Sequence, residues 1–283
     1  MTELDKTYWS MPVVQDDDHA NNFPNSPDIS IEIVNDVTAI PSLEEEWDKL
    51  ALNSSATIFQ TFDWQYQWWR HFADKPDHHL FIVLFKIEER LVGIAPFFIQ
   101  SYLFRHYRFF MRLMLLGSGL QKSQSPVLSL EKEGPSDYLD IIVEHGLEKE
   151  VANALVNFIK RESYLWNEID FQNIKEDGII FNYVLPKLAE NNFTITKTVT
   201  DICPRFLLPE SVEKFISSMR PKVRRNLRYV QRNYLANPEF TLVDISDEKN
   251  VTGAIESLLQ LHQKRWNAIG YPGLFSDRCF DTF

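Results

Sequence analysis

The strongest strand pattern in the sequence is LFIVLFKIEERLVGIAPFFI, Leu80 to Ile99. It holds two runs of branched and aromatic residues, Leu80 to Ile87 and Leu91 to Ile99, of the kind that strands favour. The polar segment Glu88 to Arg90 separates the two runs, so we predict a β-hairpin. Pro96 lacks a backbone N–H and predicts a bulge or an edge position late in the second strand.

Strand and helix patterns alternate on both sides of this hairpin. Before it, Ile29, Ile31 and Ile33 alternate with polar residues as a half-buried strand would. Ser42 and Glu45 then predict a capping box at the start of a helix. This alternation predicts a mixed α/β domain. The other expected elements are strands at Phe109 to Leu116, Ile169 to Phe171, Phe193 to Val199 and Phe240 to Ile245, and helices at Leu147 to Arg161, Ile179 to Leu188 and Val251 to Trp266.

Length and composition limit the class of protein. With 283 residues and 44% hydrophobic content, the chain can form one large or two ordinary domains with real cores. A net charge of −11 and a pI near 5.1 argue against nucleic-acid binding over the whole surface. Residues 1–28 are acidic and lack hydrophobic periodicity, so we predict a disordered tail there.

Expectations for cellular location and metal binding depend on membrane-span, secretion-signal and cysteine patterns. No apolar run reaches the about 18 residues of a membrane span, and the N-terminus has no secretion-signal pattern, so we expect a cytoplasmic protein. Cys203 and Cys279 lie far apart and form no CxxC pair. Neither a structural zinc site nor a disulfide framework is indicated, and we expect no metal cofactor.

A basic helix is the main functional clue in this acidic chain. It is predicted at Met219 to Ala236, MRPKVRRNLRYVQRNYLA, which contains no Asp or Glu. Apolar residues recur at helical spacing on one face, and arginines occupy another. The arginines could serve only to keep the helix soluble, or they could form an anion-binding site. We favour an anion site for a phosphate-bearing ligand. The apolar stripe is Val223, Leu227, Val230 and Tyr234, and the candidate phosphate-binding residues are Arg220, Arg224, Arg225, Arg228 and Arg232.

Two other segments are weaker candidates for chemistry. Gly117-Ser118-Gly119 follows an expected strand and could offer backbone N–H groups to a phosphate, but a lone GxG is a weak signal and a simple turn is the favoured interpretation. Asp137 and Asp140 could act as an acid–base pair if buried together, but surface or helix-capping roles are commoner for such residues.

Six motifs, in order from about Thr57 to Asp277, resemble one known family. The motifs are IFQTFDWQYQWWRHF, LVGIAPF, LLGSG, SDYLDIIV, FISSMRPKVRRNLRYVQR and LHQKRWNAIGYPGLFSD. By these motifs the chain is similar to tandem-GNAT acyltransferases related to CelD-type polysaccharide proteins (CelD/BioF-like acetyltransferase domains) and, more distantly, to FemABX aminoacyltransferases.

The resemblance implies two GNAT-like domains and acyl transfer. It places a first GNAT-like domain at residues 29–206 and an incomplete second one at residues 207–283. It further implies transfer of an acetyl group from acetyl-CoA to an amine or hydroxyl of a sugar, polysaccharide or cell-envelope precursor. Backbone N–H groups would polarise the thioester carbonyl, and no cysteine nucleophile is needed. The catalytic base is not assigned.

The resemblance also gives the basic helix its role. It implies that the five arginines bind a phosphate-bearing substrate or donor. His262, Arg265 and Trp266 stand in the matching LHQKRW motif, which implies that they line the cleft. In the family the second domain continues beyond the FSD motif, and the pyrophosphate loop is expected in that continuation.

Two alternatives stay open from the sequence. The chain could be a non-catalytic module that uses residues 219–236 to bind nucleic acid or an anionic membrane surface, although the acidic remainder and the absence of a nucleic-acid motif argue against nucleic acid. It could also be an inactive fragment of the enzyme. The oligomeric state is not predicted.

Overall fold

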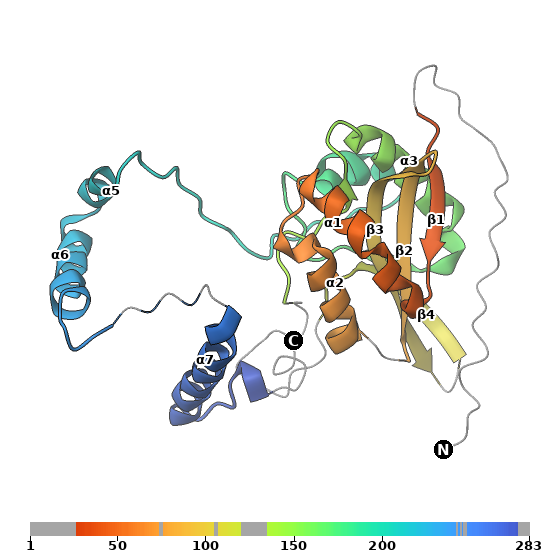
Figure 1. The fold of residues 1–283 in the computed structure, drawn as a ribbon. Helices are drawn as coiled ribbons and strands as arrows, with labels where there is room; N and C mark the ends of the chain where they lie inside the picture. The colour runs from red at the N-terminus through yellow and green to blue at the C-terminus, as the bar shows by residue number, and fades with distance from the viewer. Residues whose placement is uncertain are drawn as a thin grey trace.

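The computed structural model describes residues 27–73, 76–104, 107–119, 135–241, 243, 245 and 248–276. They form a mixed sheet with helices on both faces, followed by helices that lie apart from it (Figure 1). This confirms the predicted mixed α/β class. The strand order is β1-β2-β3-β4-β6, with β5 paired to β3. The strands are β1 Ser30–Val34, β2 His78–Ile87, β3 Arg90–Phe104, β4 Tyr107–Leu115, β5 Ile142–Val143 and β6 Glu168–Asp170.

The hairpin of β2 and β3 is the centre of the sheet, as predicted. Its turn is tight, because Ile87 pairs with Arg90 and Glu88 adopts a φ of 55°. Side chains alternate between two separate cores, so Phe81 and Val83 face one helical layer while Ile82 and Leu84 face the other. Burial on both faces explains why the two strands read as continuous apolar runs.

Pro96 lies at neither an edge nor a bulge, so that prediction was wrong. It stands inside β3 opposite Ile82, and the register shifts of this strand occur elsewhere. Its carbonyl accepts a hydrogen bond from the Leu116 N–H at 2.7 Å, and the missing N–H faces the same side. On that side the partner of β3 changes from β5, paired at Ile94, to β4, paired from Phe97 onward. The proline therefore occupies a gap between two partners, where no ladder bond is lost.

Helices bury one side each against the two faces of the sheet. On the first face Trp47 and Trp68 are 1% exposed, and on the second Leu155 and Ile180 are fully buried. The first layer comprises η1 Val37–Leu43, α1 Glu44–Leu52, η2 Ile58–Gln60, α2 Phe62–Trp68 and η3 Trp69–Ala73. The second comprises α3 Glu148–Arg161, η4 Ser163–Leu165, η5 Ile180–Val184 and α4 Leu185–Glu190.

The expected capping box was placed at the wrong residues. Ser42 bonds the Ala39 carbonyl, and the helical segment begins earlier, with the Asp36 side chain as its cap. A capping box does occur at Thr57 and Gln60, before η2. Sequence spacing alone did not distinguish the two positions.

Two expected strands are not formed. Residues 193–199 have no strand pairing among the described residues, and most of them are exposed. Their alternating pattern had predicted a strand, but only Phe193 and Ile195 pack against the core. The described residues between Phe240 and Ile245 are likewise exposed and unpaired. An alternating pattern becomes a strand only beside an available sheet edge, and neither segment has one in the described part.

The helices beyond residue 210 extend away from the sheet (Figure 1). No residue of α5 or α6 is buried. Pro221 begins α6 with Arg220 as its N-cap, so the predicted basic helix is confirmed. These elements are α5 Val212–Ser218, α6 Pro221–Val230, η6 Gln231–Leu235, α7 Glu248–Ala268 and η7 Leu274–Ser276. The predicted tail at residues 1–28 lies almost wholly outside the described residues, as does Cys279.

Candidate functional site

The candidate site lies at the carboxyl ends of two neighbouring parallel strands. β4 and β6 pair in parallel, and their last ladder pair joins Met114 to Asp170. Beyond that pair β4 continues into the Gly117-Ser118-Gly119 turn, and β6 continues into Gln172. Ligands of open α/β sheets bind outside the carboxyl ends of such strands, where the loops that follow neighbouring strands diverge.

The loop of residues 136–140 is fixed beside this turn. Ser136 is fully buried, and its hydroxyl accepts a hydrogen bond from the Trp64 indole N–H at 2.8 Å. Its carbonyl accepts one from Asn173 Nδ2 at 3.2 Å. Gln60 Nε2 donates to the Tyr138 carbonyl at 2.7 Å. Since these partners come from two distant parts of the chain, residues 60–64 and Asn173, the loop is held rigidly in place.

Residues in the left-handed region of the backbone gather here. Tyr138 has a φ of 54° and Asn173 a φ of 52°, and the Leu139 N–H between them donates to the Asn173 carbonyl at 2.9 Å. For a bulky tyrosine this conformation is costly, and such strain persists only where the surroundings impose it. Gly117, at a φ of 97°, could not carry a side chain, because its Cβ would lie 2.7 Å from the Ser136 hydroxyl.

The Tyr138 side chain meets the segment that leads toward α5. The Cys203 thiol hydrogen-bonds its hydroxyl, and this bond is the main reason why the pKa of Tyr138 is raised. The Arg205 guanidinium lies 6.0 Å from the ring centroid and 3.9 Å from the Asp177 carboxylate. The segment that leads toward α5 therefore contacts the sheet unit at this loop.

Asp140 is a helix cap, in agreement with the second interpretation of the sequence. Its carboxylate accepts backbone N–H groups from Ile141, Ile179 and Ile180 at 2.9, 2.5 and 2.9 Å. Burial raises the pKa of Asp140 to about 6, against the opposing effect of these bonds. Asp137 is exposed. The two carboxylates therefore share no buried acid–base site.

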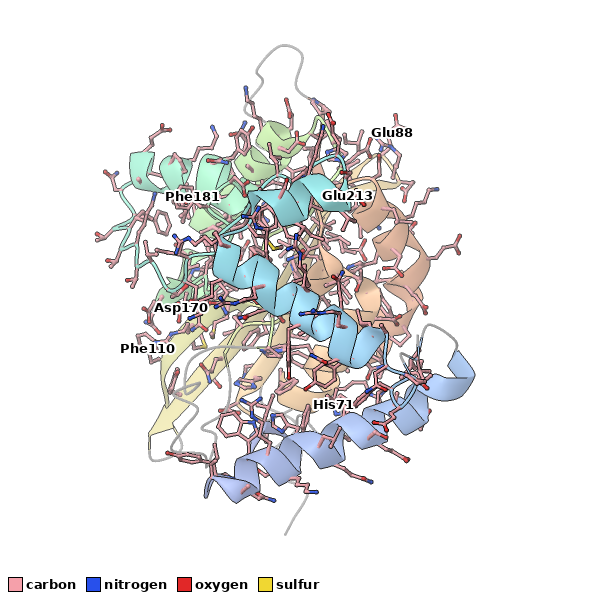
Figure 2. All side chains as sticks on the ribbon, turned by 90° about the vertical axis from the view of Figure 1, so that its left-hand side faces the viewer. His71, Glu88, Phe110, Asp170, Phe181 and Glu213 are labelled. Carbon is pink, nitrogen blue, oxygen red and sulfur yellow. The ribbon has the colours of Figure 1, made fainter. Side chains whose placement is uncertain are left out.

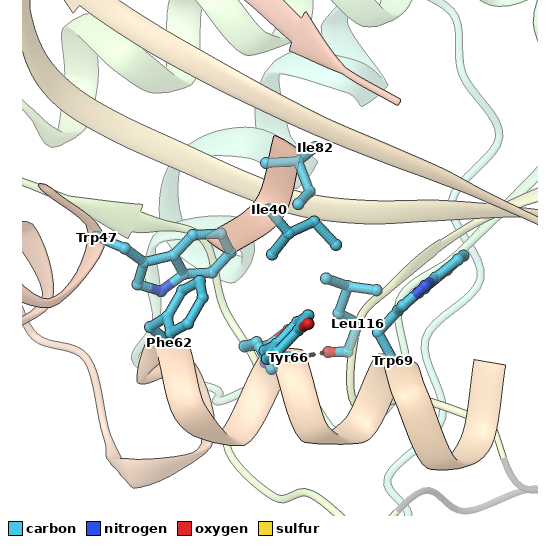
Figure 3. A pocket seen from close by; sticks show the side chains of 8 residues that line it. Ile40, Trp47, Phe62, Tyr66, Trp69, Ile82 and Leu116 are labelled. Carbon is cyan, nitrogen blue, oxygen red and sulfur yellow. Dashed lines mark hydrogen bonds between the residues drawn. The ribbon is translucent and has the colours of Figure 1, made fainter. Parts of the chain in front are cut away.

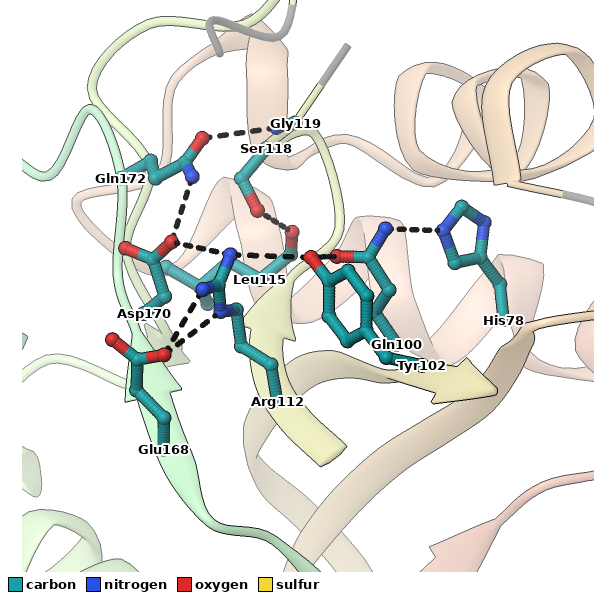
Figure 4. A network of polar contacts seen from close by, with 10 residues as sticks. All are labelled: His78, Gln100, Tyr102, Arg112, Leu115, Ser118, Gly119, Glu168, Asp170 and Gln172. Atoms are coloured by element: carbon teal, nitrogen blue, oxygen red, sulfur yellow. Dashed lines mark hydrogen bonds and ion pairs between the residues drawn. The ribbon is translucent and has the colours of Figure 1, made fainter. Parts of the chain in front are cut away.

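A chain of polar contacts crosses the sheet and ends at the Gly117–Gly119 turn (Figure 4). Arg112 donates two bonds to Glu168, at 3.0 and 3.1 Å, and its Nη1 lies 3.6 Å from Asp170. Gln172 links Asp170 to the Gly119 N–H, with bonds of 2.8 and 3.1 Å. In the other direction the chain passes through Tyr102 and Gln100 to His78.

A small apolar pocket lies behind the same end of β4 (Figure 3). Leu116 forms part of its wall, together with Trp69 and Phe62. Gln65 also lines it, and its Oε1 has no hydrogen-bond partner within the described part of the chain. The other walls are aromatic and aliphatic side chains of the first helical layer and of β2. No group of His, Cys, Asp and Glu among the described residues could hold a metal ion.

Four of the five predicted arginines are exposed and Arg224 is half-buried, and no contact with this site is found for them among the described residues. Arg224 bonds the Ser217 carbonyl and Arg232 bonds the Arg228 carbonyl, so these contacts are local to α5 and α6. Figure 2 shows α6 and α7 as separate helices in front of the sheet unit. No carboxylate partner is found among the described residues for any of the five, which are Arg220, Arg224, Arg225, Arg228 and Arg232.

The second predicted set lies on α7. The His262 ring is 6.0 Å from Trp266 and 4.8 Å from Phe275, so these rings form a local cluster. Arg265 stands beside them in sequence and is exposed. The structure brings His262 and Trp266 together but does not join them to the α6 arginines. None of the described helices is long and apolar enough to cross a membrane.

Several residues of the site could not be recognised from the sequence. Ser136 and Tyr138 stand in the SDYLDIIV motif, and Trp64 in the aromatic motif, but no pattern revealed that they meet. Gln172 and Asn173 carried no signal at all. Their roles depend on contacts between segments more than 35 residues apart in sequence, such as the 37 residues that separate Ser136 from Asn173.

Comparison with known proteins gives similarity only at the level of solved structures. No protein-family model and no curated protein matches the chain. An aminoglycoside N-acetyltransferase in complex with CoA is 15% identical, with 65% of this chain and 99% of that chain covered and a TM-score of 0.34. A ribosomal-protein-alanine N-acetyltransferase from Brucella melitensis biovar Abortus is 14% identical, with 63% and 100% covered and a TM-score of 0.31. An aminoglycoside 6'-N-acetyltransferase from Acinetobacter baumannii is 11% identical, with 63% and 99% covered and a TM-score of 0.32.

These three structures have acetyltransferase names, at low TM-scores, whereas another similar structure is named a transcriptional regulator from Bacillus halodurans. TM-scores this low carry no argument about the fold. The fold is instead described by the chain's own topology, a mixed sheet with one parallel pair at β4 and β6. The tandem family named by the sequence motifs is not confirmed.

Proposed function

We propose that the chain is an acyltransferase that moves an acetyl group from acetyl-CoA to an amine or hydroxyl of a sugar, polysaccharide or cell-envelope precursor in the cytoplasm. One observation carries the proposal. At the carboxyl ends of β4 and β6, the Gly117–Gly119 turn lies beside a loop that is fixed by Trp64, Gln60 and Asn173. Backbone N–H groups held in such a place can stabilise negative charge on a carbonyl oxygen.

The proposed reaction is direct transfer. The acceptor nitrogen or oxygen forms a bond to the acyl carbon, the carbon–sulfur bond breaks, and the proton lost by the acceptor balances the thiol that leaves. Backbone N–H groups near Gly119 would stabilise the tetrahedral intermediate. Asp140 is committed to three backbone N–H groups and is not proposed as the base.

The phosphates of the donor are proposed to meet the arginine face of α6. Residues 207–283 hold 11 basic and 9 acidic side chains, against 18 and 31 in residues 1–206, so this part is positive in an acidic chain. Arg225, Arg228 and Arg232 are exposed and have no carboxylate partner among the described residues. We propose residues 29–206 as a first GNAT-like unit and residues 207–283 as the start of a second, with α6 approaching the donor. His262, Arg265 and Trp266 would line the same cleft.

Titration calorimetry with acetyl-CoA tests this function. We expect saturable heat from the wild type and a loss of about 10-fold or more in affinity when Arg225, Arg228 and Arg232 are replaced by Gln, since bonds to charged groups contribute about 1.5–3 kcal/mol each. The control replaces three exposed cations of the sheet unit, Lys49, Arg70 and Lys149, by Gln and should bind as the wild type does. Absence of heat from the folded wild type would remove the proposal.

A second candidate function is a non-catalytic module that docks α6 on an anionic surface. It is favoured by the exposure of the apolar stripe as well, because Val223, Val230 and Tyr234 are 43–48% exposed. The same two triple variants separate the functions. A module would lose retention on anionic vesicles in the arginine variant and give no heat with acetyl-CoA in any form.

A further inference from the structure

The Gly119 amide is bound by a side chain across the seam between β4 and β6. Backbone pairing of the two strands ends at Met114 and Asp170. Past this point the segments that follow the two strands are connected by a hydrogen bond, which the Gly119 N–H donates to Gln172 Oε1 at 3.1 Å. A backbone N–H at the end of a parallel strand is thus occupied by a half-buried glutamine and not by another strand.

The neighbours of Gln172 fix which end of its amide faces Gly119. Gln172 Nε2 donates to Asp170 Oδ2 at 2.8 Å, and an ionised carboxylate only accepts. The amide oxygen must therefore point toward the Gly119 N–H. Asp170 is held in turn by Arg112, whose guanidinium binds Glu168 and lies 5.7 Å from the centroid of the Tyr102 ring (Figure 4).

From this geometry we infer that Gln172 is a positioning residue whose side-chain oxygen occupies the place of the acyl oxygen at Gly119 until the reaction displaces it. The inference rests on the proposed acyl transfer. A thioester oxygen is a weaker acceptor than an amide oxygen, so it competes poorly with Gln172 for the N–H. The tetrahedral intermediate carries a full charge on that oxygen, and charge-assisted bonds are about twice as strong as neutral ones.

This arrangement determines which acceptor can take the Gly119 N–H. Gln172 releases the N–H to the charged oxygen of the intermediate and keeps it in the presence of the neutral oxygen of the bound substrate. Removal of the glutamine oxygen should therefore tighten the binding of acetyl-CoA, whose carbonyl then takes an N–H that has no other partner. If Gln172 only stabilised the structure, its removal would have the opposite effect. The contact between the ends of β4 and β6 would become disordered, and acetyl-CoA would bind more weakly.

The test uses Gln172→Ala and Gln172→Leu in the full chain, with Gln100→Leu as a control in the same network that does not touch Gly119. Both Gln172 variants should bind acetyl-CoA about 2- to 10-fold more tightly by calorimetry, the value of one neutral hydrogen bond. Leucine keeps the volume of the side chain, so agreement between the two variants excludes a packing effect. Amide hydrogen exchange at Gly119 should be faster in both variants and unchanged in the control.

Three other results are informative. Faster exchange at Gly119 with unchanged or weaker acetyl-CoA binding would overturn the inference and leave the proposed function standing. Unchanged exchange at Gly119 would show that Gln172 does not hold this amide, which also overturns it. No acetyl-CoA binding by the wild type or any variant would remove the proposed function and this inference together.

Discussion

The sheet unit and the C-terminal helices have similar amphipathic patterns but opposite environments. On α3, Leu155 is fully buried, whereas on α7 Leu261 is 67% exposed. Both leucines stand in helices that the sequence predicted. Periodicity therefore predicts that a helix forms, but only the packed structure shows what covers its apolar face.

The largest effect that separates the two regions is the loss of a buried leucine. Leu155→Ala should lower the free energy of unfolding of the sheet unit by about 2–5 kcal/mol, because it removes buried methyl groups and leaves a cavity. Leu261→Ala should change it by less than about 0.5 kcal/mol. Urea unfolding followed by tryptophan fluorescence measures both. Equal losses in the two variants would mean that α7 is packed on the sheet unit in solution.

The same comparison shows what the sequence could predict. The hairpin of β2 and β3, the helices α3 and α6 and the mixed α/β class all follow from local patterns of apolar residues. The strand expected at residues 193–199 failed because a strand needs a partner edge, which is not a local property. The prediction for Pro96 was wrong for the same reason, since the gap between β5 and β4 depends on how these strands meet β3.

The candidate site was predicted less well than the fold. The Gly117–Gly119 turn and Asp140 were recognised, but as separate features with two interpretations each. Their meeting point depends on Trp64 and Asn173, which bind the same serine from distant segments. The predicted arginines can be recognised in the sequence because charge is a local property. Their ligand, the phosphates of the donor, is a proposal.

Asp140 gives a second, pH-dependent distinction within the sheet unit. Burial raises the pKa of its carboxyl from 3.8 to about 6, so the folded state keeps a proton that the unfolded state has lost. Its contribution to stability is greatest below pH 3.8, falls as the pH rises through about 6 and is constant above that. The whole change is at most about 3 kcal/mol.

Two asparagine variants isolate this contribution. The difference in unfolding free energy between wild type and Asp140→Asn should vary with pH in this window, because the asparagine does not titrate. Asp137→Asn, at an exposed position three residues away, is the matched control for loss of a carboxylate from the same loop. Urea titrations at several pH values between 3.5 and 7 measure both. A pH-independent difference for Asp140→Asn would mean that its carboxyl titrates alike in the folded and unfolded states.

The smallest effect concerns the strained backbone of Tyr138, and its sign is more informative than its size. At a φ of 54°, glycine has no Cβ to strain, so Tyr138→Gly should be more stable than Tyr138→Ala by about 1 kcal/mol. At Tyr66, inside α2, the order should reverse, with alanine more stable than glycine by about 1 kcal/mol. Each pair loses the same tyrosine contacts, so the difference between glycine and alanine reports the backbone alone. If alanine were the more stable residue at both positions, the loop of residues 136–140 would not be held in its left-handed conformation. The fixed geometry that supports acyl transfer at the carboxyl ends of β4 and β6 would then lose its physical basis.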